Sequence, residues 1–345
     1  MKKNLFYTFI IFLGIMLFPF SIKAAPVGLN FSVAPSEEQY TAKGYFDFQT
    51  QANQVTNLTV NLTNTSSKKI TVHIEKLNAL TDSNGNITYV SKKAVKDSKL
   101  LDQTRLAKKY LKGPNQVILA AKESKKVTFT YHAPKNIHDG QVVGGLNFYE
   151  NSGNSSDNYS SSDKSFKITN RVTRMIAIVA NYQPLQAKLT VGKAFLTSDS
   201  ANPLINIKMK NTVAQMGHDL RFSYTLKNND GKTLYHQKFT AAKTGTPFAP
   251  VSSWVQQINW PLKTYREGTY HLTLHVKTAS PAQSVTKNYT LKVKNKDVSA
   301  FQKASGTKNV AKTNWGLIIA VIVLAILVIA LIITNIRMYQ KNRKS

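Results

Sequence analysis

The stretch LTVNLTN, residues 58–64, alternates apolar and polar side chains along its whole length. In an extended chain Leu58, Val60 and Leu62 lie on one side and the polar residues on the other, which is the period of a half-buried β-strand. The alternation returns at residues 70–74 and 127–131, and turn-forming Asn, Ser, Asp and Gly residues lie between these segments. Short alternating strands at this spacing predict a β-sandwich.

A second set of alternating segments follows the polar stretch NSGNSSDNYSSSDKS, residues 151–165, which contains no large aliphatic side chain. Such a composition predicts a flexible loop or a linker. Beyond it lie a nearly continuous apolar segment at residues 174–180 and alternating segments that include Ile205, Ile207, Leu272 and Leu274. We therefore expect an all-β fold with two immunoglobulin-like β-sandwich domains in tandem, at residues 28–150 and 166–294, followed by a lysine-rich polar stalk at residues 295–314.

Both ends of the chain carry apolar segments. Residues 1–24 combine early lysines with a long apolar run and then small residues, the pattern of a cleaved secretory signal peptide. Residues 315–336 contain no charged side chain and are long enough to cross a hydrocarbon core of ~30 Å as a helix. Because basic residues follow at 337–345, we expect a single-pass membrane protein with its domains exported into the cell wall and its C-terminus in the cytoplasm. The residues expected to anchor this helix are Trp315, Arg337, Lys341, Arg343 and Lys344.

The chain has a formal net charge of +29 and contains no cysteine. Without disulfides, an exported chain of this size must be stabilised by core burial and sheet hydrogen bonds. Lysine far outnumbers arginine in the expected exported region. This balance favours diffuse attraction to polyanions, such as phosphate-rich wall polymers or anionic lipid, over recognition of nucleic acid.

The densest basic cluster is SKKAVKDSKLLDQTRLAKKYLKG, residues 91–113. Its apolar residues, among them Leu100, Ala107 and Leu111, fit one stripe of a short helix. The cluster is then a solvated insertion that packs on the sheet by that stripe, or alternatively a wall-binding patch. The lysines that would contact the wall are Lys92, Lys93, Lys96, Lys108 and Lys109.

Three glycines, Gly140, Gly144 and Gly145, interrupt a predicted strand at residues 138–150. Glycine inside a strand marks a bulge, a bend or a close backbone approach. We interpret the three as backbone geometry where the last strand of the first sandwich bends toward the linker. The alternative is a flat edge to which a partner strand adds. Trp254 and Trp260 likewise have two interpretations, core packing or stacking on a sugar or peptide.

The sequence carries no arrangement of residues typical of an enzyme. It contains no His-Glu-x-x-His, Gly-x-Ser-x-Gly or Cys-His pattern, and its carboxylates are scarce and scattered. His271 and His275 share a strand face but stand ~13 Å apart, too far to ligate one metal ion. We therefore expect no enzymatic activity, no cofactor and no metal site.

Several local stretches resemble the WxL-interacting protein family of Gram-positive bacteria. They are LNFSV at residues 29–33, GYFDF at 44–48, the strand at 58–64 followed by SSKKITV at 66–72, and DGQVVGGL at 139–146. The chain departs from the family pattern at Ala52-Asn53-Gln54 and at Val251, which weakens any transfer of roles residue by residue. The resemblance implies a peptidoglycan-binding first domain and a so-called host-binding second domain. It also implies WxL-domain surface proteins as partners, and host matrix proteins as a further partner class.

These observations together predict a membrane-anchored, non-enzymatic cell-surface adaptor for WxL-domain proteins and peptidoglycan. The alternative is a lysine-rich wall protein that binds polyanions or glycans without a dedicated protein partner. Salt separates the two, because a counterion-driven contact weakens steeply with ionic strength while strand pairing and apolar docking weaken little.

Overall fold

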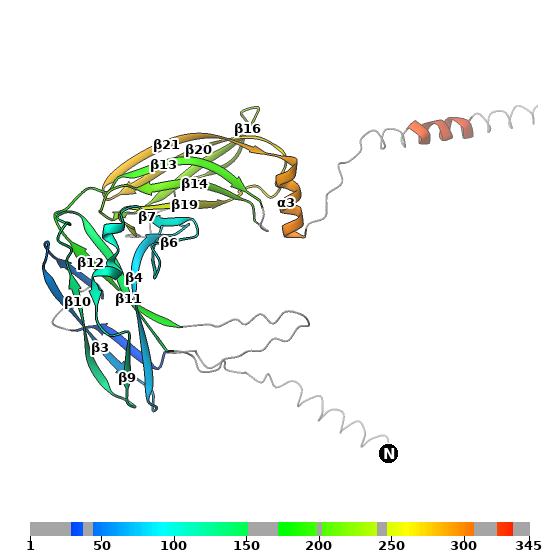
Figure 1. Cartoon of the computed structure of the whole chain (residues 1–345). Coiled ribbons are helices and arrows are strands. Elements are labelled where there is room, and N and C mark those ends of the chain that lie inside the picture. The colour runs from blue at the N-terminus through cyan, green and yellow to red at the C-terminus, as the bar shows by residue number, and fades with distance from the viewer. Residues whose placement is uncertain are drawn as a thin grey trace, which may run out of the picture.

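The computed structural model of the protein describes residues 29–36, 44–150, 172–198, 202–239, 247–306 and 323–333. Two β-sandwiches follow one another along the chain and are set at an angle, so that the molecule is bent (Figure 1). The all-β prediction is confirmed for these residues. The expected signal peptide and basic tail lie outside the described residues.

Only the middle of the expected membrane-spanning segment is described, as a helix at residues 323–333. Within the described residues, no helix is both long enough and apolar enough to cross a membrane.

The first sandwich packs a four-stranded sheet, in the order β1-β3-β10-β8, against a larger sheet. The strands of the smaller sheet are β1 (Phe31–Pro35), β3 (Val55–Asn64), β10 (Ser124–His132) and β8 (Leu111–Lys112). The larger sheet has the order β2-β12-β11-β4-β5, with β9 also paired to β4. Its strands are β2 (Phe46–Gln49), β12 (Thr173–Asn181), β11 (Gln141–Glu150), β4 (Ile70–Thr81), β5 (Ile87–Val90) and β9 (Gln116–Leu119).

The alternation read from the sequence decides which side chains enter this core. Leu58, Val60 and Leu62 of β3 are buried, while the polar residues between them are only partly covered. Across the sandwich, the rings of Phe129 and Phe148 meet edge to face, with centroids 6.3 Å apart. Burial of apolar surface in this layer is the main favourable contribution to folding, since no cysteine is present to form a disulfide.

Strand β12 lies in the first sandwich, although the sequence placed it at the start of the second. It pairs antiparallel with β11 over nearly its whole length and parallel with β2. The chain leaves β11 at Glu150 and re-enters beside it at Thr173, which pairs with Tyr149. The segment between therefore joins two neighbouring strands of one sheet. The connection between the sandwiches is instead the stretch from β12 to Leu189, where β13 begins.

The second sandwich packs a five-stranded sheet, in the order β13-β14-β19-β7-β6, against a four-stranded sheet, in the order β17-β16-β20-β21. The five-stranded sheet contains β13 (Leu189–Thr197), β14 (Leu204–Asn211), β19 (Ser252–Asn259), β7 (Ser98–Leu100) and β6 (Ala94–Val95). The four-stranded sheet contains β17 (Thr233–Gln237), β16 (Arg221–Asn228), β20 (Gly268–Ala279) and β21 (Ala282–Val293). A small pair, β15 (Gly217–His218) and β18 (Pro247–Phe248), completes it.

The predicted helix at residues 91–113 is mostly wrong. This insertion first forms the β6–β7 hairpin, in which Asp97 takes a positive φ of 64° at the turn. It continues into a 3-10 turn, η2 (Gln103–Arg105), and a single helical turn, α2 (Ala107–Tyr110). Leu100, expected on a helical stripe, is a strand residue with 5% exposure. Buried Ser98 and Leu100 lie on either side of exposed Lys99, which is the period of two of a β-strand. The many lysines of this segment obscured that period in the sequence.

Residues 295–305, expected to begin a polar stalk, form the helix α3 (Asn295–Ser305). Asp297 accepts a hydrogen bond from the backbone of Lys294, at 2.9 Å, and so caps the first turn. Phe301 then packs edge-on against Tyr265 of the second sandwich, with ring centroids 5.7 Å apart. Val298 also packs on the same core, so the helix is held against the sandwich by two apolar side chains.

Candidate functional site

The junction between the two sandwiches is built by strands from both. Strand β7, from the first half of the chain, pairs with β19 so that Leu100 lies opposite Ser252 and Ser98 opposite Trp254. Side chains also join β4 to β19, since the hydroxyls of Thr81 and Ser252 are 2.8 Å apart. The Ala249 amide also donates to the Thr81 hydroxyl at 3.0 Å. The first domain thus completes a sheet of the second.

Two apolar clusters fill the space beside these hydrogen bonds. Their members come from both sandwiches and are all buried. One contains Leu80, Leu100, Leu106, Ala214 and Val251, and the other contains Ala79, Val143, Val179 and Ala249. Because a shared sheet, side-chain hydrogen bonds and two mixed apolar clusters all join the sandwiches, the two sandwiches form one body rather than two domains on a flexible linker.

Gly140 lies where the first sandwich touches the second. Its φ is +67°, and a Cβ at this position would stand 2.2 Å from the carbonyl oxygen of Ala214. The Gly140 amide donates to the Gln183 carbonyl at 2.6 Å, and the Gly140 carbonyl accepts from the Tyr182 amide at 2.8 Å. Both the backbone conformation and the close approach require glycine here. Backbone geometry was the predicted role, but its purpose is domain contact.

Gly144 and Gly145 lie in the middle of a sheet, not at its end. A Cβ on Gly144 would stand 2.4 Å from the Cβ of Ala107, so this glycine makes room for α2. A Cβ on Gly145 would face Tyr89 on the opposite side of the strand, at 3.3 Å. Both edges of β11 are already paired, with β12 and β4. The alternative interpretation of a free edge for a partner strand is therefore wrong.

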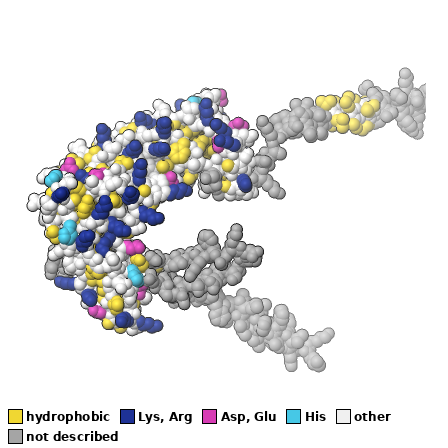
Figure 2. Space-filling view, in the orientation of Figure 1, with side chains coloured by type: hydrophobic (Ala, Val, Ile, Leu, Met, Phe, Trp, Pro, Cys, Tyr) yellow, Lys and Arg dark blue, Asp and Glu magenta, His cyan; other side chains and the backbone are white. Residues whose placement is uncertain are grey.

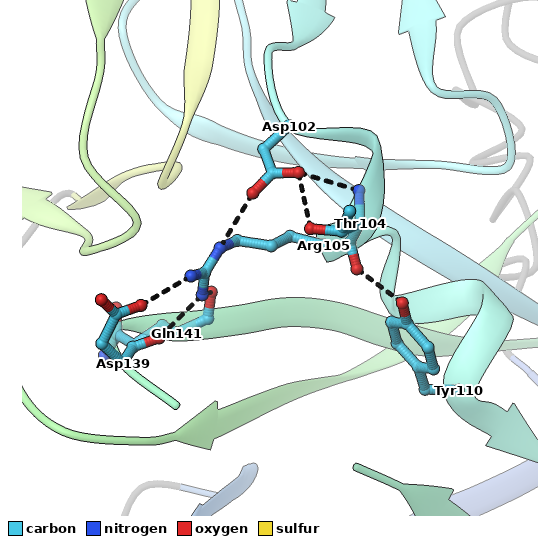
Figure 3. Close-up of polar contacts among 6 residues, drawn as sticks. All are labelled: Asp102, Thr104, Arg105, Tyr110, Asp139 and Gln141. Atoms are coloured by element: carbon cyan, nitrogen blue, oxygen red, sulfur yellow. Dashed lines mark hydrogen bonds and ion pairs between the residues drawn. The ribbon is translucent and has the colours of Figure 1, made fainter. Parts of the chain in front are cut away.

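A polar network ties the insertion to the junction (Figure 3). The Arg105 guanidinium donates to a carboxylate oxygen and the carbonyl of Asp139, both at 2.8 Å, and to Asp102 at 3.2 Å. Thr104 donates to Asp102 through its amide and its hydroxyl, and the Tyr110 hydroxyl donates to the Thr104 carbonyl at 2.6 Å. Asp139 immediately precedes Gly140, so the network holds the insertion against the point of domain contact.

The charge of Asp102 depends on this network. Partial burial opposes the ionised form, but hydrogen bonds from Thr104 and the Arg105 guanidinium hold the pKa of Asp102 below its usual value. The side chain of Arg105 is only 10% exposed. Arg105 was not among the predicted site residues, although it is the one arginine in a cluster of lysines, and arginine is the residue that can join several oxygen acceptors at once.

The predicted wall-contact lysines are all exposed. Lys92, Lys93 and Lys96 lie at the β6–β7 hairpin, and Lys108 and Lys109 lie on α2. Figure 2 shows Lys and Arg side chains spread over the visible face of both sandwiches, with few acidic ones between them. Near α2, burial and then the charges of Lys112 and Lys108 lower the pKa of Lys76. Positive charge is therefore concentrated there.

The two tryptophans are core residues, not surface contacts. Trp254 is 2% exposed, packs against Phe248 at 5.8 Å and donates its indole N–H to Gln256 at 3.3 Å. Trp260 is 8% exposed and donates to the Thr264 carbonyl at 3.0 Å. The proposed stacking of either ring on a sugar or peptide is wrong, because the second sandwich buries both.

The described residues contain no group of three or more His, Cys, Asp or Glu side chains placed to hold a metal ion. The expected membrane anchors Trp315, Arg337, Lys341, Arg343 and Lys344 lie outside the described ranges. The structure therefore gathers Gly140, the insertion and Arg105 at the junction, and leaves the lysines on the surface around it.

Solved structures that match the chain at low similarity include bacterial chaperones. The class 5 fimbriae chaperone CfaA is 12% identical, with a TM-score of 0.30, and covers 77% of this chain and 100% of its own. The E. coli chaperone DraB is 13% identical, with a TM-score of 0.29, over 77% of this chain and 97% of its own. The CsuC-CsuE pre-assembly complex of Acinetobacter baumannii is 12% identical, with a TM-score of 0.32, over 71% of this chain and 95% of that chain. Scores this low carry no conclusion about function.

No curated protein sequence matches the chain significantly. Two family models do match it, and they cover most of its length. The peptidoglycan binding domain of WxL Interacting Protein matches residues 31–150, and the host binding domain of WxL Interacting Protein matches residues 163–302. The resemblance seen in the sequence is confirmed, and this chain belongs to the WxL-interacting protein family.

Proposed function

We propose that this protein is a membrane-anchored, non-enzymatic adaptor that holds WxL-domain proteins and peptidoglycan at the surface of the cell. The observation that carries the proposal is that both matched regions are binding domains and are fused into one body at the junction. A rigid body can hold two ligands at a fixed separation, whereas two domains joined by a flexible linker cannot.

The non-enzymatic character rests on the chemistry of the surface. The Arg105 guanidinium donates its hydrogen bonds to the protein's own carboxylates and carbonyls, so these donors are not free to bind a substrate. The tyrosines with raised pKa values, such as Tyr89 at about 12, owe the shift first to burial. A neutral buried phenol with so high a pKa is a poor general base near neutral pH.

The proposed location is the outer side of the membrane, with residues 1–24 removed and residues 315–336 spanning the bilayer. The helix at residues 323–333 supports this topology, because large apolar side chains such as Leu324, Ile326 and Leu331 are 60 to 67% exposed. A helix that is apolar on all sides is stable in lipid and unfavourable in water. Epitope tags placed at the two ends test this topology, which fails if a C-terminal tag is accessible on intact cells.

The two domains would reach on the order of 120 Å from the bilayer, taking ~35 Å for each domain and adding the connecting segments. A thick wall extends further, so host contact would be made mainly through the partners that the protein holds. Antibody labelling of the second domain before and after removal of the wall measures this directly. Full labelling on intact cells would place the domain outside the wall.

The adaptor role is tested with the full chain in detergent, immobilised and incubated with a wall extract, then washed at low and at high salt. Retention of a WxL-domain protein at high salt is the expected result. A triple variant, Lys92→Gln, Lys93→Gln and Lys96→Gln, serves as the comparison for charge. If all retained material is wall polymer that high salt or the triple variant removes, the protein is a polyanion binder instead.

A further inference from the structure

A groove of about 480 Å³ lies on the exposed face of the five-stranded sheet. Its lining comes from both halves of the chain, since β6 and β7 belong to the first and β14 and β19 to the second. The residues that form it include Val95, Lys99, Leu101, Lys208, Lys210 and Val255. The groove therefore exists only because the insertion of the first sandwich completes the sheet of the second.

Three lysines rise from this face. Lys208 and Lys210 alternate with the buried Met209 on β14, so both point away from the core. Two residues along a strand are ~6.6 Å apart. Ser253 lies between Lys210 and Lys99 in the register, so those two lysines are separated by two strand spacings, ~9.6 Å. The only acidic residue in the described lining is Asp97, at the hairpin turn.

Apolar side chains also line the groove. Leu101 lies two positions beyond Lys99, lines the groove and is 37% exposed. Val255 lies half-buried opposite Lys208. A polyanion held by charge alone would leave these side chains in contact with water. A ligand that carries acidic groups and apolar groups in alternation would match both features at once.

We propose that this groove binds an extended acidic segment of a partner protein. Side chains two positions apart on an extended chain recur at the same ~6.6 Å as Lys208 and Lys210, so successive acidic residues on one side face successive lysines. The intervening apolar residues cover Leu101 and Val255. The proposal rests on the adaptor role and names the surface through which a protein partner docks.

The test uses the full chain in detergent and a short fluorescein-labelled peptide that alternates glutamate and valine, with binding measured by fluorescence anisotropy. The double variant Lys208→Gln and Lys210→Gln should weaken binding by about tenfold, because it removes two ion pairs between exposed side chains and the peptide. The matched control is Lys227→Gln with Lys292→Gln, which removes the same charge from the opposite sheet and should leave binding unchanged.

A second variant separates a peptide from other anions. Leu101→Ser should weaken peptide binding by about threefold through the lost apolar contact, and it should leave binding of inorganic polyphosphate unchanged. Phosphatidylglycerol vesicles form the third arm. The proposal is overturned if the control pair weakens peptide binding as much as the groove pair does. It is also overturned if the peptide does not bind, or if only polyphosphate or vesicles depend on Lys208 and Lys210.

The adaptor role can stand while this inference fails. If the groove pair still retains the same WxL-domain protein from a wall extract as the unaltered chain, the partner docks elsewhere and the groove is not its site. If neither chain retains such a protein while the peptide result holds, the adaptor role itself is refuted.

Discussion

The two sandwiches each contain a piece that the sequence assigned to the other, and the two pieces differ in kind. The first sandwich takes in β12, a central strand with nine paired positions and a buried apolar side. The second takes in β6 and β7, two short strands at one end of its five-stranded sheet, with β6 at the edge and exposed lysines around them. A central strand contributes to the core, whereas a charged edge contributes surface and protects the sheet from further pairing. Strand β12 therefore stabilises the first sandwich, whereas β6 and β7 give the second sandwich a surface for recognition.

The largest effect is expected at Gly140, where the two sandwiches touch. Gly140→Ala should destabilise the protein by about 3 kcal/mol, because it adds a left-handed residue with a Cβ and overpacks the junction. The close approach to the Ala214 carbonyl cannot be relieved by turning a side chain, since that oxygen belongs to the backbone. Urea unfolding monitored by tryptophan fluorescence measures the change.

Gly231→Ala is the matched control for this substitution. Gly231 also has a positive φ, +80°, but no atom lies within 4 Å of its added Cβ. It should lose only about 1 kcal/mol, the conformational part of the effect. Equal losses at the two positions would mean that domain contact contributes nothing at Gly140.

Removal of the guanidinium at the junction should have the next largest effect. Arg105→Gln should cost about 1.5 kcal/mol, since it removes hydrogen bonds to two charged groups that are themselves partly exposed and screened. Arg266→Gln, an exposed arginine in the second sandwich, should change stability little. The urea midpoints of the two variants measure the difference. An unchanged midpoint for Arg105→Gln would show that the polar network does not stabilise the junction.

Acid should weaken the same network through Asp102. Its pKa is lowered in the folded state, so its contribution is present above the unfolded value and is lost as pH falls through the folded value. Asp102→Asn should therefore destabilise the protein near pH 7, and the difference in stability should shrink as the pH falls through the folded-state pKa of Asp102 and the carboxyl becomes protonated. Urea midpoints of the two proteins across this range give the result, and a gap that persists in acid would show that charge is not its cause.

The smallest effect is expected at the β6–β7 hairpin, which the first half of the chain contributes to the second sandwich. Changing Lys92, Lys93 and Lys96 together to glutamine should alter stability by less than ~0.5 kcal/mol, because all three side chains are exposed. Thermal unfolding checks this. A loss of several degrees in the melting temperature would mean that the lysines hold the hairpin in place, and the distinction between a stabilising piece and a surface piece would disappear.

Local periodicity predicted the strands well and their partners poorly. The alternation at Leu58, Val60 and Leu62 placed the right side chains in the core. It held no information on the pairing of β7 with β19, which joins positions such as Leu100 and Ser252 that are far apart in the sequence. Such pairings are decided by which apolar faces remain uncovered after local strands form, and that is a property of the whole chain.

The candidate site shows the same limit. The lysines were found because exposure follows from charge. The two interpretations of the tryptophans stayed open because an aromatic ring looks the same in sequence whether it lies in a core or on a surface. Gly140 was singled out for its residue type, yet only the neighbouring Ala214 explains the need for it. Arg105 was missed because its acceptors Asp102 and Asp139 meet only in the folded chain.

Strand β12 and the β6–β7 hairpin each join a sandwich other than the one expected from the sequence, and this has a consequence for how the gene evolves. A recombination event that replaced one half of the gene with that of a relative would separate each strand from the sheet it completes. The halves should therefore pass from ancestor to descendant as a single heritable block, and substitutions at β7 should be accompanied by substitutions at β19.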